Sequence, residues 1–118
     1  MAKNLLTVRL MDIYGGMLTE KQHDYLTLYY EEDLSLAEIA ANEGITRQGV
    51  RDAIKRAEIQ LADYEQHMQL LAKQQERESA LHEILGSVQT IRKLGYIGEI
   101  GNESAKIERI AHSLLMSA

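Results

Sequence analysis

The sequence of 118 residues contains no cysteine, no proline, no tryptophan and no phenylalanine. Without cysteine the chain cannot form a disulfide framework, a thiolate metal site or a cysteine nucleophile, and this composition is typical of a reducing compartment. Without proline, a chain rich in leucine, alanine, glutamate and glutamine has few helix breakers. We therefore predict an all-α fold and a cytoplasmic location.

The chain also lacks a long uncharged stretch. Its longest segment without aspartate, glutamate, lysine or arginine is Ile110–Ala118, nine residues, whereas a transmembrane helix needs roughly twenty apolar residues. Arg9 and Asp12 interrupt the apolar run near the N-terminus, so this run does not match a signal peptide. We expect no membrane insertion.

The sequence offers little for catalysis or cofactor binding. Its four histidines are scattered, and no H-E-x-x-H pair occurs. Gly95, Gly98 and Gly101 do not form a dinucleotide fingerprint, because no strand precedes them and the G-x-G start is missing. We therefore predict that the protein is not an enzyme and has no catalytic residue, metal or cofactor.

Capping signals in the first half of the chain indicate two consecutive helices joined by a turn. Ser35, followed three residues later by Glu38, has the spacing of a capping box. The helix over residues 36–43 is expected to end at Gly44, and Thr46 is expected to cap the next helix. Two helices joined by such a glycine turn are typical of a helix-turn-helix.

The second of these helices has a basic outward face. Between Arg47 and Arg56 there are four basic residues and one acidic residue, although the whole chain has a net charge of −5. Arginine pairs with guanine and glutamine with adenine in the major groove, and flanking residues hold phosphates. The predicted DNA-binding residues are Thr46, Arg47, Gln48, Arg51, Lys55 and Arg56. A solvated surface or a protein-docking module can have the same pattern, so a protein ligand stays open.

The same helix continues as a heptad seam of apolar residues, a spacing typical of coiled coils. The seam consists of Val50, Ile54, Ala57, Leu61, Tyr64, Met68 and Leu71. It predicts a single helix from Arg47 to about Gln75, with a hinge in the polar run Gln74–Ser79. The far half must lie against the chain's own C-terminal helices or against a second chain, and we predict a homodimer that pairs through Leu61, Tyr64, Met68 and Leu71.

Two further amphipathic helices, separated by a glycine-rich turn, follow the polar run. The predicted organisation is a helix-turn-helix domain with an extended helix at residues 1–75 and a C-terminal helical arm at residues 76–118. We expect the arm to serve in packing or dimerisation.

Five motifs occur in order along the first part of the chain. They are Leu18-Thr19-Glu20-Lys21-Gln22, Leu28-Tyr29-Tyr30, Asp33-Leu34-Ser35-Leu36-Ala37-Glu38-Ile39-Ala40, Thr46-Arg47-Gln48-Gly49-Val50 and Tyr64-Glu65. Together they resemble region 4 of bacterial sigma factors, and more closely the YlxM family of small helix-turn-helix proteins. The resemblance covers about residues 5–71 and does not extend to the tail.

The resemblance implies a bacterial cytosolic protein that is linked to the signal recognition particle pathway and encoded beside the particle's GTPase or its receptor. It also implies that the helix beginning at Thr46 reads double-stranded DNA through Arg47, Gln48, Arg51 and Lys55. Gly49 departs from the family pattern, which usually has alanine there. The acidic balance leaves an alternative, in which the protein regulates the particle's GTPase or receptor without binding DNA. Docking onto RNA polymerase, as sigma region 4 does, is a third possibility.

Overall fold

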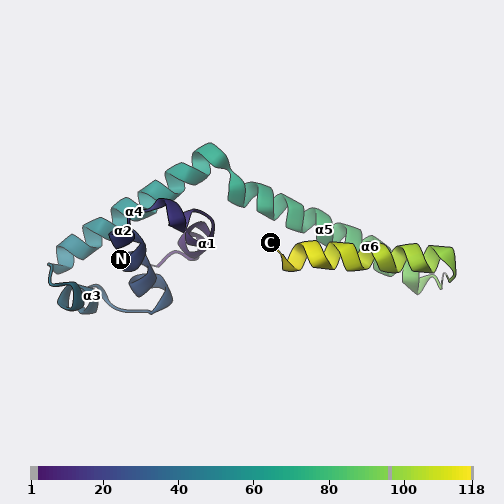
Figure 1. Ribbon diagram of the computed structural model, residues 1–118, viewed down its shortest axis with the longest axis horizontal. Coiled ribbons are helices and arrows are strands. Elements are labelled where there is room, and N and C mark those ends of the chain that lie inside the picture. Colours follow the sequence, from purple (N-terminus) through teal and green to yellow (C-terminus); the bar gives the residue numbers. More distant parts are fainter. Residues whose placement is uncertain (1–2, 96, 118) are drawn as a thin grey trace. The chain divides into compact units, whose positions relative to one another are not determined.

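The computed structural model describes residues 3–95 and 97–117, and this part of the chain is all-α, with no strand (Figure 1). Its helices are α1 (Leu5–Tyr14), α2 (Glu20–Leu26), α3 (Leu36–Glu43), α4 (Arg47–Met68), α5 (Leu70–Lys93) and α6 (Glu99–Met116). A 3₁₀ turn, η1 (Gly15–Met17), follows α1, and a π-helical turn, η2 (Thr27–Glu31), follows α2. The predicted fold class is confirmed.

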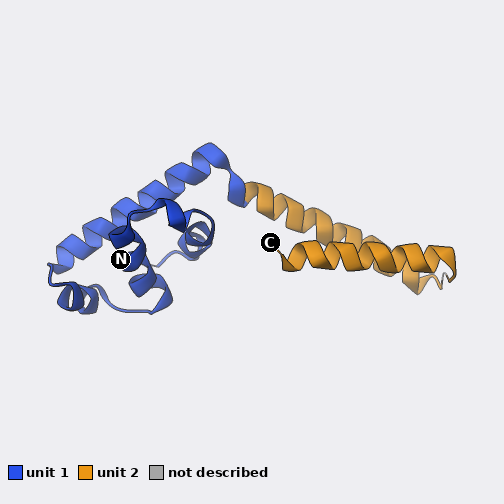
Figure 2. Ribbon diagram, viewed as in Figure 1, with its two compact units in different colours: residues 1–71 blue, residues 72–118 orange. Residues whose placement is uncertain are grey.

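The chain divides into two compact units (Figure 2). Unit 1 is Met1–Leu71 and contains α1 to α4, and unit 2 is Ala72–Ala118 and contains α6 and most of α5. The sequence pattern placed this division at residue 75. Each unit is described by itself below.

The caps expected from the sequence are present in unit 1. The Ser35 hydroxyl accepts the Glu38 amide N–H at 3.1 Å, and the Glu38 carboxylate accepts the Ser35 N–H at 3.2 Å. Thr46 Oγ1 accepts the Gly49 N–H at 3.0 Å. These bonds satisfy amide groups that have no partner within the first turn of a helix, so α3 and α4 begin where the capping pattern predicts.

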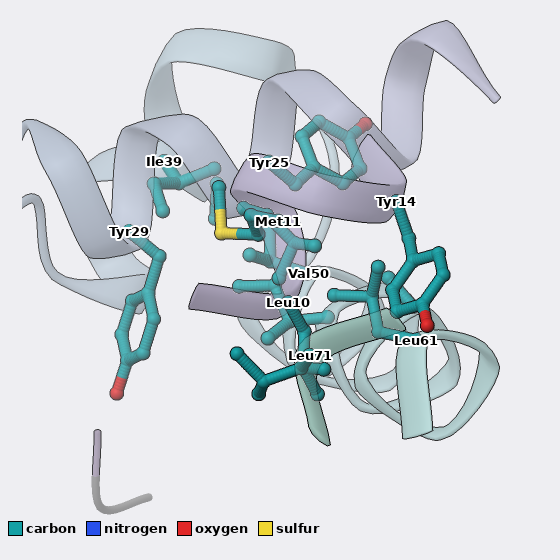
Figure 3. Close-up of a cluster of buried hydrophobic side chains, with 13 residues drawn as sticks. Leu10, Met11, Tyr14, Tyr25, Tyr29, Ile39, Val50, Leu61 and Leu71 are labelled. Atoms are coloured by element: carbon teal, nitrogen blue, oxygen red, sulfur yellow. The ribbon is translucent and has the colours of Figure 1, made fainter. Parts of the chain in front are cut away.

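The core of unit 1 is built on one face of α4. Val50, Ile54, Ala57 and Leu61 on this face are each 0% exposed. Side chains from α1, α2, η2 and α3 pack against them, and these are Leu10, Met11, Tyr14, Tyr25, Leu26, Tyr29, Ile39 and Ala40 (Figure 3). Removal of this apolar surface from water is the main force that assembles the unit.

Two tyrosine hydroxyls connect the N-terminal segments to α4. Tyr14 Oη donates to Glu65 Oε1 at 2.6 Å, and Tyr30 Oη donates to Glu58 Oε1 at 2.7 Å. The two glutamates are seven residues apart, about two turns of the same helix. Burial, followed by the hydrogen bond to the carboxylate, raises the pKa of both tyrosines.

The prediction of one continuous helix from Arg47 to about Gln75 is wrong, because the structure breaks this segment into two helices. α4 ends at Met68, and Gln69 has a left-handed backbone with φ 54° before α5 begins. The polar run at residues 74–79, predicted to be a hinge, is helical and lies inside α5. The break therefore lies earlier in the chain than the loss of the heptad pattern suggested.

Two side chains of unit 1 explain where the new helix starts. Glu65 Oε1 accepts the Leu71 N–H at 2.9 Å, and the Tyr14 hydroxyl accepts the Leu70 N–H at 3.0 Å. Both amides belong to the first turn of α5, where no carbonyl of the same helix is available to them. Glu65 and Tyr14 thus act as a cap supplied from other elements.

The prediction that Leu61, Tyr64, Met68 and Leu71 pair with a second copy also needs correction. Leu61 and Leu71 are buried in the core of unit 1, and Tyr64 and Met68 are partly buried against it. The ring centroids of Tyr64 and Tyr14 are 6.0 Å apart, so this part of the seam faces α1 of the same chain. Leu61 and Leu71 are therefore used inside unit 1, whereas Tyr64 and Met68 keep part of their surface exposed.

In unit 2, α5 and α6 run antiparallel (Figure 1). Arg92 Nη1 and Glu108 Oε2 connect the two helices at 2.6 Å. The buried side chains of this pair are Leu85, Val88, Ser104 and Ala111. Among the residues that the structure describes, no helix combines the length and the apolar character needed to cross a bilayer.

Two neighbouring aliphatic residues on α4 test the role of its buried face. Leu61→Ala should lower the free energy of unfolding by about 2–5 kcal/mol, because it leaves a cavity in the core. Ile59→Ala, at a side chain 70% exposed, is the matched control and should change it by no more than about 0.5 kcal/mol. Urea unfolding followed by circular dichroism measures both, and equal effects would contradict the assigned core.

The raised pKa values of Tyr14 and Tyr30 predict a loss of stability in alkali. In the unfolded chain both hydroxyls ionise near the ordinary pKa of 10.0. Stability is therefore fully present below about pH 10 and falls as the pH rises through the higher pKa of the folded state.

Urea unfolding at a series of pH values from about 8 to about 11 measures this loss. The double variant Tyr14→Phe/Tyr30→Phe should be less stable at neutral pH, because it removes both hydrogen bonds to α4. It should also lose less stability above pH 10 than the wild type. If the free energy of unfolding falls equally for the two proteins above pH 10, Tyr14 and Tyr30 are not the source of the loss of stability.

Candidate nucleic-acid interface

The turn between α3 and α4 has helix-turn-helix geometry. Gly44 has a left-handed φ of 69°, which a residue without Cβ adopts at little cost. The Gly44 and Ile45 amides donate to the Ala40 carbonyl oxygen at 3.0 Å and 3.2 Å. Ile39 and Ala40 on α3 share the core with Val50 on α4, so the two helices are packed together directly after the turn.

The side chains predicted to contact DNA gather along the first turns of α4. Arg47, Gln48, Lys55 and Arg56 are exposed, and Arg51 is half-buried. Thr46 is exposed as well, but its hydroxyl oxygen already accepts the amide hydrogen bond that caps the helix. Because Val50 and Ile54 face the core, the helical period directs the neighbouring polar residues to the outside.

One contact on this face orients a predicted base-reading side chain. Gln48 Nε2 donates to Asp52 Oδ1 at 2.9 Å, an i, i+4 pair on the exposed side of α4. The bond uses one amide hydrogen and leaves the Gln48 Oε1 and a second amide hydrogen for a ligand. The outward polar pattern indicated both residues, but not that they are bonded to each other.

Gly49 lies against the helix cap. A Cβ atom added at this position would be 3.1 Å from Thr46 Oγ1 and 3.7 Å from the Ile45 Cδ1 atom. The glycine therefore relieves crowding at the cap oxygen that starts α4.

An open hollow of about 430 Å³ lies beside Arg47, and sequence reasoning did not find it. Asp33 and Glu38 balance the positive charges of Lys3 and Arg47 in its lining. Lys3 forms an ion pair with Asp33, which lowers the pKa of that carboxyl, and its ammonium lies 4.6 Å from the centre of the Tyr29 ring. This balance of charge does not favour a phosphate, so the hollow is not included in the interface.

The charges are distributed unequally between the two units. Unit 1 has seven basic and twelve acidic residues, whereas unit 2 has six of each. Four of the seven basic residues of unit 1 lie between Arg47 and Arg56. The interface is thus a small basic face on an acidic unit, and few phosphate contacts are available to it. In the part of the chain that the structure describes, no three histidine, aspartate or glutamate side chains lie where they could hold a metal ion.

The chain is similar to a family of known proteins over most of its length. Residues 1–97 match the UPF0122 family, described as "Putative helix-turn-helix protein, YlxM / p13 like". The match includes α1 to α5 and ends before α6 begins.

Three curated bacterial relatives are all described as UPF0122 proteins. The protein from Desulforamulus reducens is 46% identical over 76 residues, 64% of this chain and 65% of its own length. The protein from Halalkalibacterium halodurans is 44% identical over 86 residues, 73% of this chain and 79% of its own. The protein from Bacillus cereus is 51% identical over 69 residues, 58% of this chain and 63% of its own. The match thus spans just under two-thirds of the relatives from D. reducens and B. cereus.

Proposed function

The chain belongs to the UPF0122 family of YlxM / p13-like helix-turn-helix proteins, and from this premise we propose that it is a DNA-binding regulatory protein. In this proposal α4 is the recognition helix and lies in the major groove of double-stranded DNA. The observation that supports it is the basic face of α4 at residues 47–56, exposed directly after the helix-turn-helix turn. The resemblance to region 4 of bacterial sigma factors also supports α4 as the recognition helix.

Each residue of this face has a separate proposed role. Arg47 and Arg51 suit guanine, and Gln48 suits adenine, because their paired donors and acceptors match the edges of those bases. Lys55 lies further along α4 and also suits guanine, whereas Arg56 beside it suits a phosphate oxygen. Thr46 adds a contact at the start of the helix, where amide groups and the helix dipole favour a phosphate.

The charge distribution of unit 1 affects how tightly the protein can bind DNA. Because unit 1 carries a net negative charge, its attraction to arbitrary DNA is weak, and base contacts have to supply a larger share of the binding free energy. We also propose that the protein acts in the cytosol as a homodimer, since a dimer binds two half-sites and doubles these contacts.

Loss of one base-reading side chain tests the proposed interface. Arg51→Ala should weaken binding to the DNA upstream of the protein's own gene by about 1–3 kcal/mol and relax the preference at one base pair. Arg77→Ala, which removes the same charge from the exposed face of α5, is the matched control and should leave binding unchanged. Fluorescence anisotropy with labelled duplex measures both dissociation constants.

The salt dependence of the same binding counts the phosphates that are neutralised. With four basic side chains on each recognition helix, the slope of log K against log salt should be no steeper than about −4 for each copy bound. No binding at low salt, or equal binding by wild type, Arg51→Ala and Lys55→Ala, would reject DNA as the ligand of this face.

A second candidate function follows from the acidic side of unit 1. Exposed carboxylates precede α3 and lie on it, and these are Glu31, Glu32, Asp33, Glu38 and Glu43. Such a surface attracts a basic protein or ribonucleoprotein. Together with the link that the family resemblance implies, it supports a regulator of the signal recognition particle that acts on the particle's GTPase or its receptor.

Charge reversal separates this candidate from DNA binding. If the acidic surface binds the purified GTPase, Glu31→Lys/Glu32→Lys should reduce its capture by the immobilised full chain by about tenfold or more, because like charges then meet. Glu76→Lys/Glu83→Lys on α5 makes the same change of charge elsewhere and should not. Failure of the wild-type chain to capture the GTPase, together with sequence-specific DNA binding, would eliminate this candidate.

A further inference from the structure

Asp52 lies at the centre of the outward face of α4. The buried side of this helix consists of residues that are each 0% exposed, Val50, Ile54, Ala57 and Leu61. At about 100° per residue, Asp52 lies within about 10° of the direction opposite the mean of these residues, and Gln48 within about 30°. Both side chains are exposed. Gln48 and Asp52 therefore occupy the middle of the proposed reading face, although Asp52 is the only acidic residue between Arg47 and Arg56.

The Asp52 carboxylate orients the Gln48 amide. Gln48 Nε2 donates to Asp52 Oδ1 at 2.9 Å. Because an ionised carboxylate only accepts hydrogen bonds, it can bind the nitrogen of this amide but not its oxygen. The pair thus restricts the orientation in which the amide oxygen and the remaining amide hydrogen are offered to the N6 and N7 atoms of an adenine.

We propose that Asp52 determines the sequence specificity of the interface by selecting cytosine at the base pair that it faces. The inference rests on the proposed DNA-binding function and adds a residue to it. In the major groove cytosine presents only the N4 amino donor, whereas guanine presents two acceptors, thymine presents one acceptor, and adenine presents an acceptor beside its donor. A carboxylate therefore matches cytosine, and each of the other bases places an acceptor next to its negative charge.

The same carboxylate disfavours DNA of the wrong sequence. Against guanine O6 or thymine O4 it loses its water and gains no hydrogen bond, and the phosphates repel it in every sequence. Lys55 and Arg56 lie about 60° and 40° to either side of Asp52 around the helix, and their charges offset part of this repulsion. Asp52 therefore lowers the affinity at most sites and preserves it at few, which is how a repulsive element produces specificity.

Selection by the full chain from a duplex library with randomised positions tests this assignment. The wild type should select cytosine at one position of the bound site. Asp52→Asn keeps an oxygen that can accept from Gln48, but it replaces the carboxylate by an amide, which pairs with N6 and N7 of adenine. The preferred base at this position should therefore change from cytosine to adenine, a result that a merely structural role of Asp52 would not produce.

Asp52→Ala separates the effect of the charge from the orientation of Gln48. Fluorescence anisotropy with the selected duplex and with a shuffled duplex should show that the ratio of the two affinities falls at least about fivefold, the lower end of the discrimination expected at one base pair. Because Gln48 loses its partner, the adenine preference at a second position should also weaken, whereas Asp52→Asn should retain it. Asp63→Asn removes the same charge from a side chain of α4 that is 61% exposed, and this control should leave the preferred bases unchanged.

The possible outcomes separate this assignment from the proposed function. If the wild type and Asp52→Asn select the same base, or if the cytosine preference survives in Asp52→Ala, Asp52 does not determine specificity, and the sequence-specific binding of the wild type still supports the proposed function. A wild-type chain that selects no sequence would reject the proposed function together with this assignment. Because Asp52 is exposed, circular dichroism should show the same helicity in all variants.

Discussion

Unit 1 depends on the burial of one face of α4. Val50, Ile54 and Leu61 are completely buried there, and α1, α2, η2 and α3 all contribute side chains to the same cluster. Because a helix repeats every 3.6 residues, this burial also decides which residues face outward. The basic face at residues 47–56 is therefore held on a rigid element by the same packing that stabilises the fold, and the proposed recognition of base edges requires such an arrangement.

The end of α4 depends on polar groups rather than on apolar burial. Glu65 accepts hydrogen bonds from the Tyr14 hydroxyl and the Leu71 amide, and Tyr14 accepts one from the Leu70 amide. A break between two helices leaves amide groups without partners, and a buried amide without a partner is costly. By satisfying two of them, Tyr14 and Glu65 make the break at Gln69 a defined feature of the structure.

Features that depend on residues close together in the sequence were predicted correctly, whereas features that depend on residues far apart in the sequence were not. The capping box of Ser35 and the turn at Gly44 involve neighbours within a few positions, so the local pattern was sufficient to predict them. The break at Gln69 depends on a contact between residues 14 and 65, and Gln69 is not a residue type that signals a left-handed backbone. The heptad seam was read correctly as apolar, but the same spacing suits a helix of the same chain or of another chain, and the structure places α1 there. For the interface, the period of α4 identified the outward residues, but the bond between Gln48 and Asp52 required coordinates.

The separation of charge between the units has a consequence for DNA recognition. A single unit 1, with few basic residues on an acidic body, gains little from phosphate contacts, and this weakens binding to any sequence. If two copies pair as proposed, the second recognition helix binds its half-site intramolecularly, at a high effective concentration. The gain applies only where both half-sites are correct, since a wrong half-site supplies neither base contacts nor appreciable phosphate attraction. In the proposed DNA-binding dimer, weak electrostatic attraction combined with pairing of two copies would therefore increase the ratio of specific to non-specific binding, which is the quantity that matters among the many competing sites of a genome.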